Sequence, residues 1–191
     1  MSAVASLQRA VGSNGAIGAV ASAPRKPAAA VRRGASARPW SGTSLRALFL
    51  DFDGVLHPTS IGLDFESEEV IGTGLFGWLP YLTAVLRPHP DVLIVVHSTW
   101  RYTHDVDELR EMLGALAGRV VGSTPRGSRY ESITGWLQQH PGVTSFRVLD
   151  DGASEFPQPL PPELILCDPR SGVSAPDVQA ALKDWLDAGR S

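Results

Sequence analysis

The chain is poor in cysteine: Cys167 is the only one among its 191 residues. A single thiol excludes an internal disulfide and a metal site built from several cysteine ligands. Nothing in the composition requires an oxidising compartment, so we expect a cytoplasmic protein. Long apolar runs are also lacking, since none approaches the roughly 18 residues of a membrane-spanning helix, and we expect no membrane partner.

Acidic residues are absent from the first 50 positions, which hold seven Lys and Arg. Subtracting these seven from the total leaves residues 51–191 with ten basic and all twenty acidic side chains, a balance of −10. Nucleic-acid backbones need a positive surface, so this balance argues against broad nucleic-acid binding by residues 51–191. The basic first segment is still able to contact a polyanion.

Large apolar side chains are scarce in residues 1–44, which are rich in Ala, Ser, Gly and Arg. Such a segment cannot bury enough surface to offset its ordering entropy, and we predict a disordered extension. An Arg-rich, acid-free composition also fits an organelle transit peptide, and "AIGAVASAP" carries a weaker secretory pattern. The remaining 45–191 stretch is long enough for one globular domain with its own core.

The remainder of the chain alternates between short apolar runs and amphipathic segments. Near-continuous β-branched runs such as residues 91–98 are typical of strands buried on both faces of a parallel sheet. The alternation predicts a three-layer α/β domain with a mostly parallel sheet. We expect strands at 45–51, 91–98, 119–123, 145–151 and 163–168, and helices at 76–88, 103–118, 128–140 and 174–189.

Two of the expected helices carry capping signals. The helix over 103–118 has Thr103 or Asp105 as its N-cap and Gly118 as its stop. The helix over 128–140 begins at Ser128, with Glu131 three residues on, which is the pattern of a capping box.

Acidic side chains follow several of the predicted strands. Asp51 and Asp53 end the first strand, Asp150 and Asp151 end the fourth, and Asp168 ends the fifth. Because ligands bind at the carboxyl ends of parallel strands, we expect at least four of these carboxylates to converge there. Unpaired carboxylates would repel one another, and Mg²⁺ is the cation that prefers oxygen ligands, so we predict a Mg²⁺ site. The alternative is that each acid is a helix cap or a solvated strand end.

The motifs around these acids resemble those of the haloacid dehalogenase-like (HAD) phosphohydrolases. "FLDFDGVL" (49–56) resembles the first motif of that superfamily, "VVHST" (95–99) the second and "RVLDD" (147–151) the fourth. The third motif is a basic residue near the start of the preceding helix, for which Arg129 fits and Arg126 is the alternative.

A narrower likeness is to the HAD domains of Swiss-army-knife RNA repair proteins. Their pattern joins "LDFDGVLHP", "HSTWR" (97–101), "RYESITGWL" (129–137) and "VLDD" (148–151). The likeness runs from about residue 45 to the C-terminus, so we assign 45–191 to one HAD-like hydrolase domain. The gaps between the motifs leave no room for a separate cap domain, and capless relatives often act on large substrates such as nucleic-acid ends.

The resemblance implies a role for each of the acids. Asp51 would be the nucleophile that forms an aspartyl-phosphate, and Asp53 would be the general acid and then the general base. Mg²⁺ would be held by Asp51, by the backbone carbonyl of Asp53, and by Asp150 or Asp151. The second acid, Asp53, favours phosphate-ester hydrolysis over dehalogenation, which needs no protonation of the leaving group.

The resemblance also implies how a phosphorylated substrate would be held. Ser98, with Thr99 as the second choice, would bind a phosphoryl oxygen, and Arg129 would pair with the phosphate and separate the acids. Trp100 is expected in the core, while Arg101 is open to a role against a distal phosphate or the acids. His57 either touches substrate or is locally hydrogen-bonded.

The function we expect is therefore a Mg²⁺-dependent phosphatase that hydrolyses a phosphate monoester, with a nucleic-acid terminus as one possible substrate. Two alternatives stay open. One is a non-catalytic binding module of the same fold that acts with a repair partner, and the other is a phosphotransferase that uses the same intermediate. The sequence leaves the substrate and the oligomeric state open.

Overall fold

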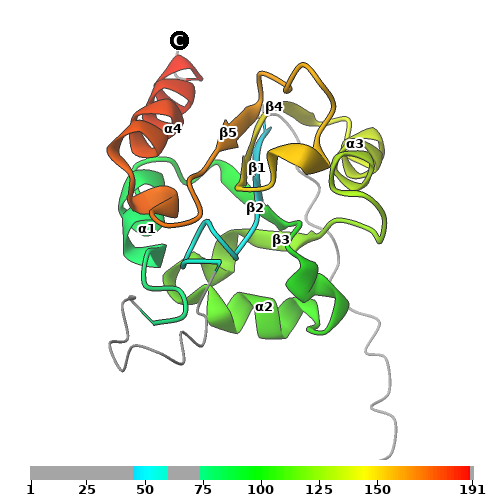
Figure 1. Cartoon of the computed structure of the whole chain (residues 1–191). Coiled ribbons are helices and arrows are strands. Elements are labelled where there is room, and N and C mark those ends of the chain that lie inside the picture. The colour runs from blue at the N-terminus through cyan, green and yellow to red at the C-terminus, as the bar shows by residue number, and fades with distance from the viewer. Residues whose placement is uncertain (1–44, 60–73, 190–191) are drawn as a thin grey trace, which may run out of the picture. The chain divides into compact units, whose positions relative to one another are not determined.

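The computed structural model describes residues 45–59 and 74–189 of the chain. The element order expected from the sequence is confirmed, and the expected basic extension over 1–44 lies outside the described residues. The elements, drawn in Figure 1, are β1 (Leu45–Leu50), α1 (Leu79–Leu86), β2 (Val92–Val96), α2 (Val106–Met112), β3 (Val120–Ser123), α3 (Arg129–Gln139), β4 (Val143–Asp150), β5 (Leu164–Leu166) and α4 (Pro176–Ala188).

The strands form one five-stranded sheet in the order β3-β2-β1-β4-β5, and every neighbouring pair is parallel. The central strand, β1, aligns Leu50 with Val96 of β2 and with Leu149 of β4. The first residues beyond these aligned positions are Asp51, His97 and Asp150. The register therefore brings these three residues to one edge of the sheet.

Side chains of β1 alternate between two apolar layers, one on each face of the sheet. Leu48 and Leu50 join a core that includes residues of α1, α2 and α4, whereas Ala47 and Phe49 join a second core with α3. Figure 1 shows α1 and α4 together on one side of the sheet and α3 on the other. The predicted three-layer α/β architecture is confirmed, and the described residues add no separate cap domain.

The helix expected over 103–118 is shorter than predicted. A 3-10 turn occupies Thr99–Tyr102, α2 spans only Val106–Met112, and a second 3-10 segment covers Gly114–Arg119. The stop is therefore not Gly118. Gly114 has a φ of 48°, a left-handed conformation that ends the regular helix four residues earlier.

Of the two capping predictions, the one for α2 is confirmed and the one for α3 is not. Asp105 is the N-cap of α2, and it forms a capping box with Glu108. Ser128 precedes α3 as expected but makes no capping hydrogen bond, because its hydroxyl donates to the Glu131 carboxylate at 2.8 Å. The capping box predicted at Ser128 is therefore wrong. None of the described helices combines the length and hydropathy that a membrane span needs.

Candidate active site

Two buried carboxylates face each other at the ends of the neighbouring strands β1 and β4. Asp51 is 1% exposed and Asp150 is fully buried. Arg129, the first residue of α3, donates through one nitrogen, Nη1, to Oδ2 of both acids. The remaining carboxylate oxygens accept backbone N–H groups, Phe52 for Asp51 and Gly152 for Asp150, at 2.8 and 2.7 Å. The guanidinium therefore separates two like charges, and no hydrogen bond from its Nε or Nη2 is found among the described residues.

A third carboxylate, that of Asp151, lies beside this pair. Thr59 donates its hydroxyl to Asp151 Oδ2 at 2.8 Å. Gly54 has a φ of 70°, and a Cβ at this position would overlap the Asp151 carboxylate. The glycine therefore permits both the tight turn after β1 and the close approach of this acid.

Oxygens of Asp51, Asp150 and Asp151 all lie within 4.8 Å of one another. Three carboxylates at this separation fit a hard divalent cation, because Mg²⁺ prefers oxygen ligands and needs only a few from the protein. The carboxylates of Asp53 and Asp168 are not in the group, so the expectation of four converging carboxylates is corrected to three. Asp168 is exposed and accepts the N–H of Arg170 in its own turn at 2.8 Å.

The carboxylate of Asp53 is held by two other side chains. Oδ2 accepts the indole N–H of Trp100 at 2.9 Å, and Oδ1 lies 3.1 Å from Nε2 of His57. The Asp53 side chain is 37% exposed, while His57 is almost fully buried. Asp53 thus remains accessible to solvent although both of its oxygens are held by ring nitrogens.

The turn after β2 carries two of the predicted phosphate-binding residues, Ser98 and Thr99. Ser98 is fully buried and its Oγ accepts the N–H of Trp100 at 3.4 Å, whereas Thr99 is exposed. Arg101 donates to the backbone carbonyls of His97 and Ser98 and to the hydroxyl of Tyr102. These bonds leave its Nε without a hydrogen-bond partner among the described residues, and no ion pair joins Arg101 to an acid there.

Arg126, the alternative to Arg129, lies against a different partner. Its guanidinium is 4.8 Å from the centroid of the Tyr102 ring, and that of Arg101 is 4.4 Å from the same centroid. Arg126 also donates to the Tyr102 carbonyl at 3.3 Å. The contact with Asp51 and Asp150 is therefore made by Arg129 and not by Arg126.

Comparison with known families gives one match. Residues 47–178 match the family described as the HAD domain in Swiss Army Knife RNA repair proteins, and this span is more than half of the chain. The chain belongs to this family. The comparisons with curated proteins and with solved structures gave no match.

The matched span contains every carboxylate of the HAD site described above. The chain thus has a HAD domain, whose family suggests a phosphohydrolase-type function, and its acidic cluster is compatible with Mg²⁺. Within the first motif, the carboxylates of Asp51 and Asp53 have different partners: Arg129 contacts Asp51, whereas ring nitrogens of Trp100 and His57 contact Asp53.

Burial and charge perturb the ionisable groups of the HAD site. Burial, together with the charge of Asp51, raises the pKa of Asp150 to about 6, and the positive charge of Arg129 opposes this rise. Burial works against a charged guanidinium at Arg129, but the charges of Asp51 and Asp150 outweigh it and raise its pKa above the ordinary value. Burial lowers the pKa of His97 to about 4, so this imidazole is neutral beside Asp150.

Several side chains of the HAD site were not singled out for these contacts by the sequence. Trp100 was expected in the core; it is half-buried against that core and also binds Asp53. His57 is locally hydrogen-bonded, one of its two expected alternatives. Thr59 gave no signal and His97 entered only as part of the "HSTWR" motif, because a single threonine or histidine near a strand end has no pattern that identifies its partner.

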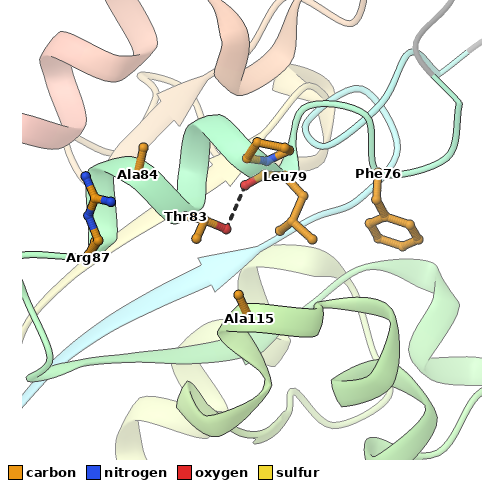
Figure 2. A pocket seen from close by; sticks show the side chains of 7 residues that line it. Phe76, Leu79, Thr83, Ala84, Arg87 and Ala115 are labelled. Atoms are coloured by element: carbon orange, nitrogen blue, oxygen red, sulfur yellow. Dashed lines mark hydrogen bonds between the residues drawn. The ribbon is translucent and has the colours of Figure 1, made fainter.

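A surface hollow of about 440 Å³ lies between α1 and the 3-10 segment Gly114–Arg119. Figure 2 shows Thr83 bonded within α1 to the Leu79 carbonyl, and Ala115 across the hollow. No acidic side chain lines the hollow, so it is not the candidate active site. The lining residues are Phe76, Leu79, Pro80, Thr83, Ala84, Arg87 and Ala115.

Proposed function

We propose that this HAD domain is a Mg²⁺-dependent phosphatase that hydrolyses a phosphate monoester through an aspartyl-phosphate. One observation carries the proposal: Asp51 lies with Asp150 and Asp151 around a common point, while Asp53 is held separately by ring nitrogens. The carboxylates of Asp51 and Asp53 lie in different environments, and such a pair is suited to different chemical roles.

In the first half of the proposed reaction, an oxygen of Asp51 attacks the phosphorus atom. The bond between phosphorus and the leaving oxygen breaks, and Asp53 donates a proton to that oxygen, which departs as an alcohol. The N–H of Phe52 and the guanidinium of Arg129 hold the Asp51 carboxylate in one orientation. This fixed orientation favours attack along a single line.

In the second half, Asp53 takes a proton from a water molecule whose oxygen attacks the same phosphorus. The bond between phosphorus and Asp51 breaks, which releases inorganic phosphate and restores the Asp51 carboxylate. Asp53 is protonated at the end of this step, so it can act as the general acid in the next catalytic cycle. The same residue thus acts as acid and then as base, and its partial exposure gives water access to it.

The remaining residues of the site bind charge. Arg129 has Nε and Nη2 available for phosphoryl oxygens, and Ser98, with Thr99 as the alternative, offers a hydroxyl at the end of β2. Mg²⁺ would be held by Asp51, the Asp53 carbonyl, and Asp150 or Asp151, and it would supply neutralisation of phosphoryl charge. Asp150 and Asp151 both stay candidates, because each offers an oxygen to the group that contains Asp51.

The test uses the full chain and 4-nitrophenyl phosphate, with phosphate release measured in MgCl₂ and in excess EDTA. We expect release only with Mg²⁺, and Asp51→Asn should reduce it by at least about 10³-fold, because an amide cannot replace the attacking carboxylate. Asp168→Asn is the matched control, since Asp168 also follows a strand but lies outside the cluster. Release that survives in Asp51→Asn would contradict the proposal.

The substrate class we propose is a phosphorylated nucleic-acid end. The family description, which names RNA repair proteins, supports it, as does the group formed by Arg101, Tyr102 and Arg126. Neither arginine of this group has a carboxylate partner among the described residues, so the group is able to attract further phosphates. A panel of end-phosphorylated oligonucleotides, nucleotides, phosphopeptides and sugar phosphates tests this choice; equal rates across the panel would contradict it.

A further inference from the structure

We infer that Trp100 and His57 are positioning residues for Asp53, and that together they aim its carboxylate at the leaving-group oxygen of the substrate. We call Trp100, His57 and Asp53 the clamp. This inference rests on the phosphatase activity proposed above. It gives a role to Trp100 and His57, which have none in the proposed reaction.

The contact from Trp100 has an unambiguous direction. An indole nitrogen only donates, so the 2.9 Å distance between Trp100 Nε1 and Asp53 Oδ2 is a hydrogen bond accepted by the acid. Trp100 lies in the 3-10 turn that follows β2, and Asp53 lies in the turn that follows β1. The bond therefore ties together the turns after two adjacent strands.

The contact from His57 has a direction as well. The backbone N–H of Phe76 points at His57 Nδ1, at 3.5 Å, so Nδ1 accepts and the ring proton resides on Nε2. Nε2 then donates to Asp53 Oδ1 at 3.1 Å. His57 is 1% exposed, so this imidazole is a fixed part of the core beneath the acid. Each oxygen of Asp53 thus has its own donor.

The rings of the clamp cannot turn away easily. Trp100 packs edge-on against Phe52 and Phe76, with centroid distances of 5.9 and 5.7 Å, and stacks on His104 at 5.4 Å. His57 packs edge-on against Phe76 at 5.3 Å. Aromatic packing of this kind fixes both donors, so rotation of the Asp53 carboxylate would break two hydrogen bonds at once.

Such a clamp matters most where proton transfer limits the reaction. A 4-nitrophenolate leaves readily as an anion, whereas a benzyl alkoxide must be protonated as it departs. If the Asp53 carboxylate loses its fixed orientation, hydrolysis of benzyl phosphate should therefore slow far more than hydrolysis of 4-nitrophenyl phosphate. A merely structural role of Trp100 would lower both rates by the same factor.

The experiment compares kcat/KM for these two esters in the full chain and in Trp100→Phe, which keeps an aromatic ring and removes the N–H. We expect a loss of about 10- to 100-fold for benzyl phosphate and of less than about threefold for 4-nitrophenyl phosphate. Trp136→Phe is the matched control. Trp136 also stacks on a histidine four residues on, His140, but it lies in the core on the α3 side.

Two further measurements separate positioning from packing. Trp100→Phe should add almost nothing to the loss already caused by Asp53→Asn, because both changes remove the same step. His57→Gln, whose amide can donate from near the position of Nε2, should retain most of the benzyl phosphate rate that His57→Leu loses. This histidine pair keeps the inference testable if Trp100→Phe does not fold.

Equal losses on the two esters, additive effects with Asp53→Asn, or no difference between His57→Gln and His57→Leu would each overturn the clamp. In all three cases the unaltered chain still turns over both esters, so the proposed phosphatase would stand. If the unaltered chain releases no phosphate from either ester in MgCl₂, the phosphatase fails and the clamp fails with it.

Discussion

Gly54 is the residue that allows the acids after β1 and β4 to approach each other. Its φ of 70° is a conformation that residues with a Cβ rarely adopt. A Cβ there would overlap the Asp151 carboxylate and come within 2.7 Å of the Thr59 hydroxyl. The first motif thus needs glycine for two separate reasons, the backbone conformation and the space beside Asp151.

These two reasons can be separated by experiment. We expect Gly54→Ala to weaken Mg²⁺ binding by at least about tenfold, because Asp151 must move, and to lose about 1–2 kcal/mol of stability to backbone strain. Gly114→Ala is the matched control, since Gly114 also has a positive φ, 48°, but a Cβ there has no neighbour within 4 Å. The readout is the rise in Tm with increasing MgCl₂; equal rises in both variants would contradict the prediction.

At the scale of elements, the helix starts differ in how they are capped. The carboxylate of Asp105 accepts the N–H groups of Asp107 and Glu108, both at 2.9 Å, and the Glu108 carboxylate accepts the N–H of Asp105 at 2.8 Å. The hydroxyl of Ser128, before α3, instead bonds the side chain of Glu131. The start of α2 therefore depends on its cap more than the start of α3 does.

This difference predicts unequal costs. Asp105→Ala should lower the free energy of unfolding by about 1 kcal/mol, the usual value of an N-cap, because two backbone donors lose their acceptor. Ser128→Ala should lower the free energy of unfolding by only about 0.3 kcal/mol, since the hydrogen bond that it removes is an exposed contact between side chains. Urea denaturation of both variants measures the difference. A larger loss in Ser128→Ala would be the contrary result.

At the scale of the whole molecule, the sheet is tied to α4 at the end opposite the acids. Arg46 of β1 is 4% exposed, and it donates to both oxygens of Asp91 at 2.6 and 3.1 Å and to the Leu186 carbonyl of α4 at 2.6 Å. The hydrogen bond from Arg46 lowers the pKa of Asp91 below its ordinary value, although partial burial opposes this. One guanidinium thus joins β1, the start of β2 and α4.

This arrangement gives stability a pH dependence with a defined sign. Because the pKa of Asp91 is lower in the folded state than the ordinary value of about 4, the stabilisation is present above that value and is lost as the pH falls through the folded-state pKa. Asp91→Asn should therefore cost about 1 kcal/mol at pH 7 and progressively less below about pH 4, the modest size reflecting the partial exposure of Asp91.

Urea unfolding of the full chain at a series of pH values from 7 to 3 measures this effect. Asp184→Asn is a suitable control, because Asp184 is an exposed acid of α4 that makes no ion pair within the described residues. Its cost should be small across the same range. A difference between the unaltered chain and Asp91→Asn that does not change with pH would contradict the prediction.

Much of the fold could be predicted because its signals are local. The β-branched run of β2 and the alternation of strands with helices follow from side-chain periodicity, which needs no knowledge of distant contacts. The boundaries of α2 could not be predicted in the same way. Whether the chain continues as a helix past Met112 depends on the conformation of Gly114 and on how Leu113 and Leu116 pack into the core.

The sequence by itself determined that acids follow β1 and β4, because a motif of adjacent residues carries that information. Only the tertiary structure decided which side chains meet them. Arg129 reaches Asp51 across 78 positions, and Trp100 reaches Asp53 across 47. Asp168, although it also follows a strand, turns into its own loop. These partners depend on the register of a parallel sheet and on the packing of its connecting turns, which no local pattern encodes.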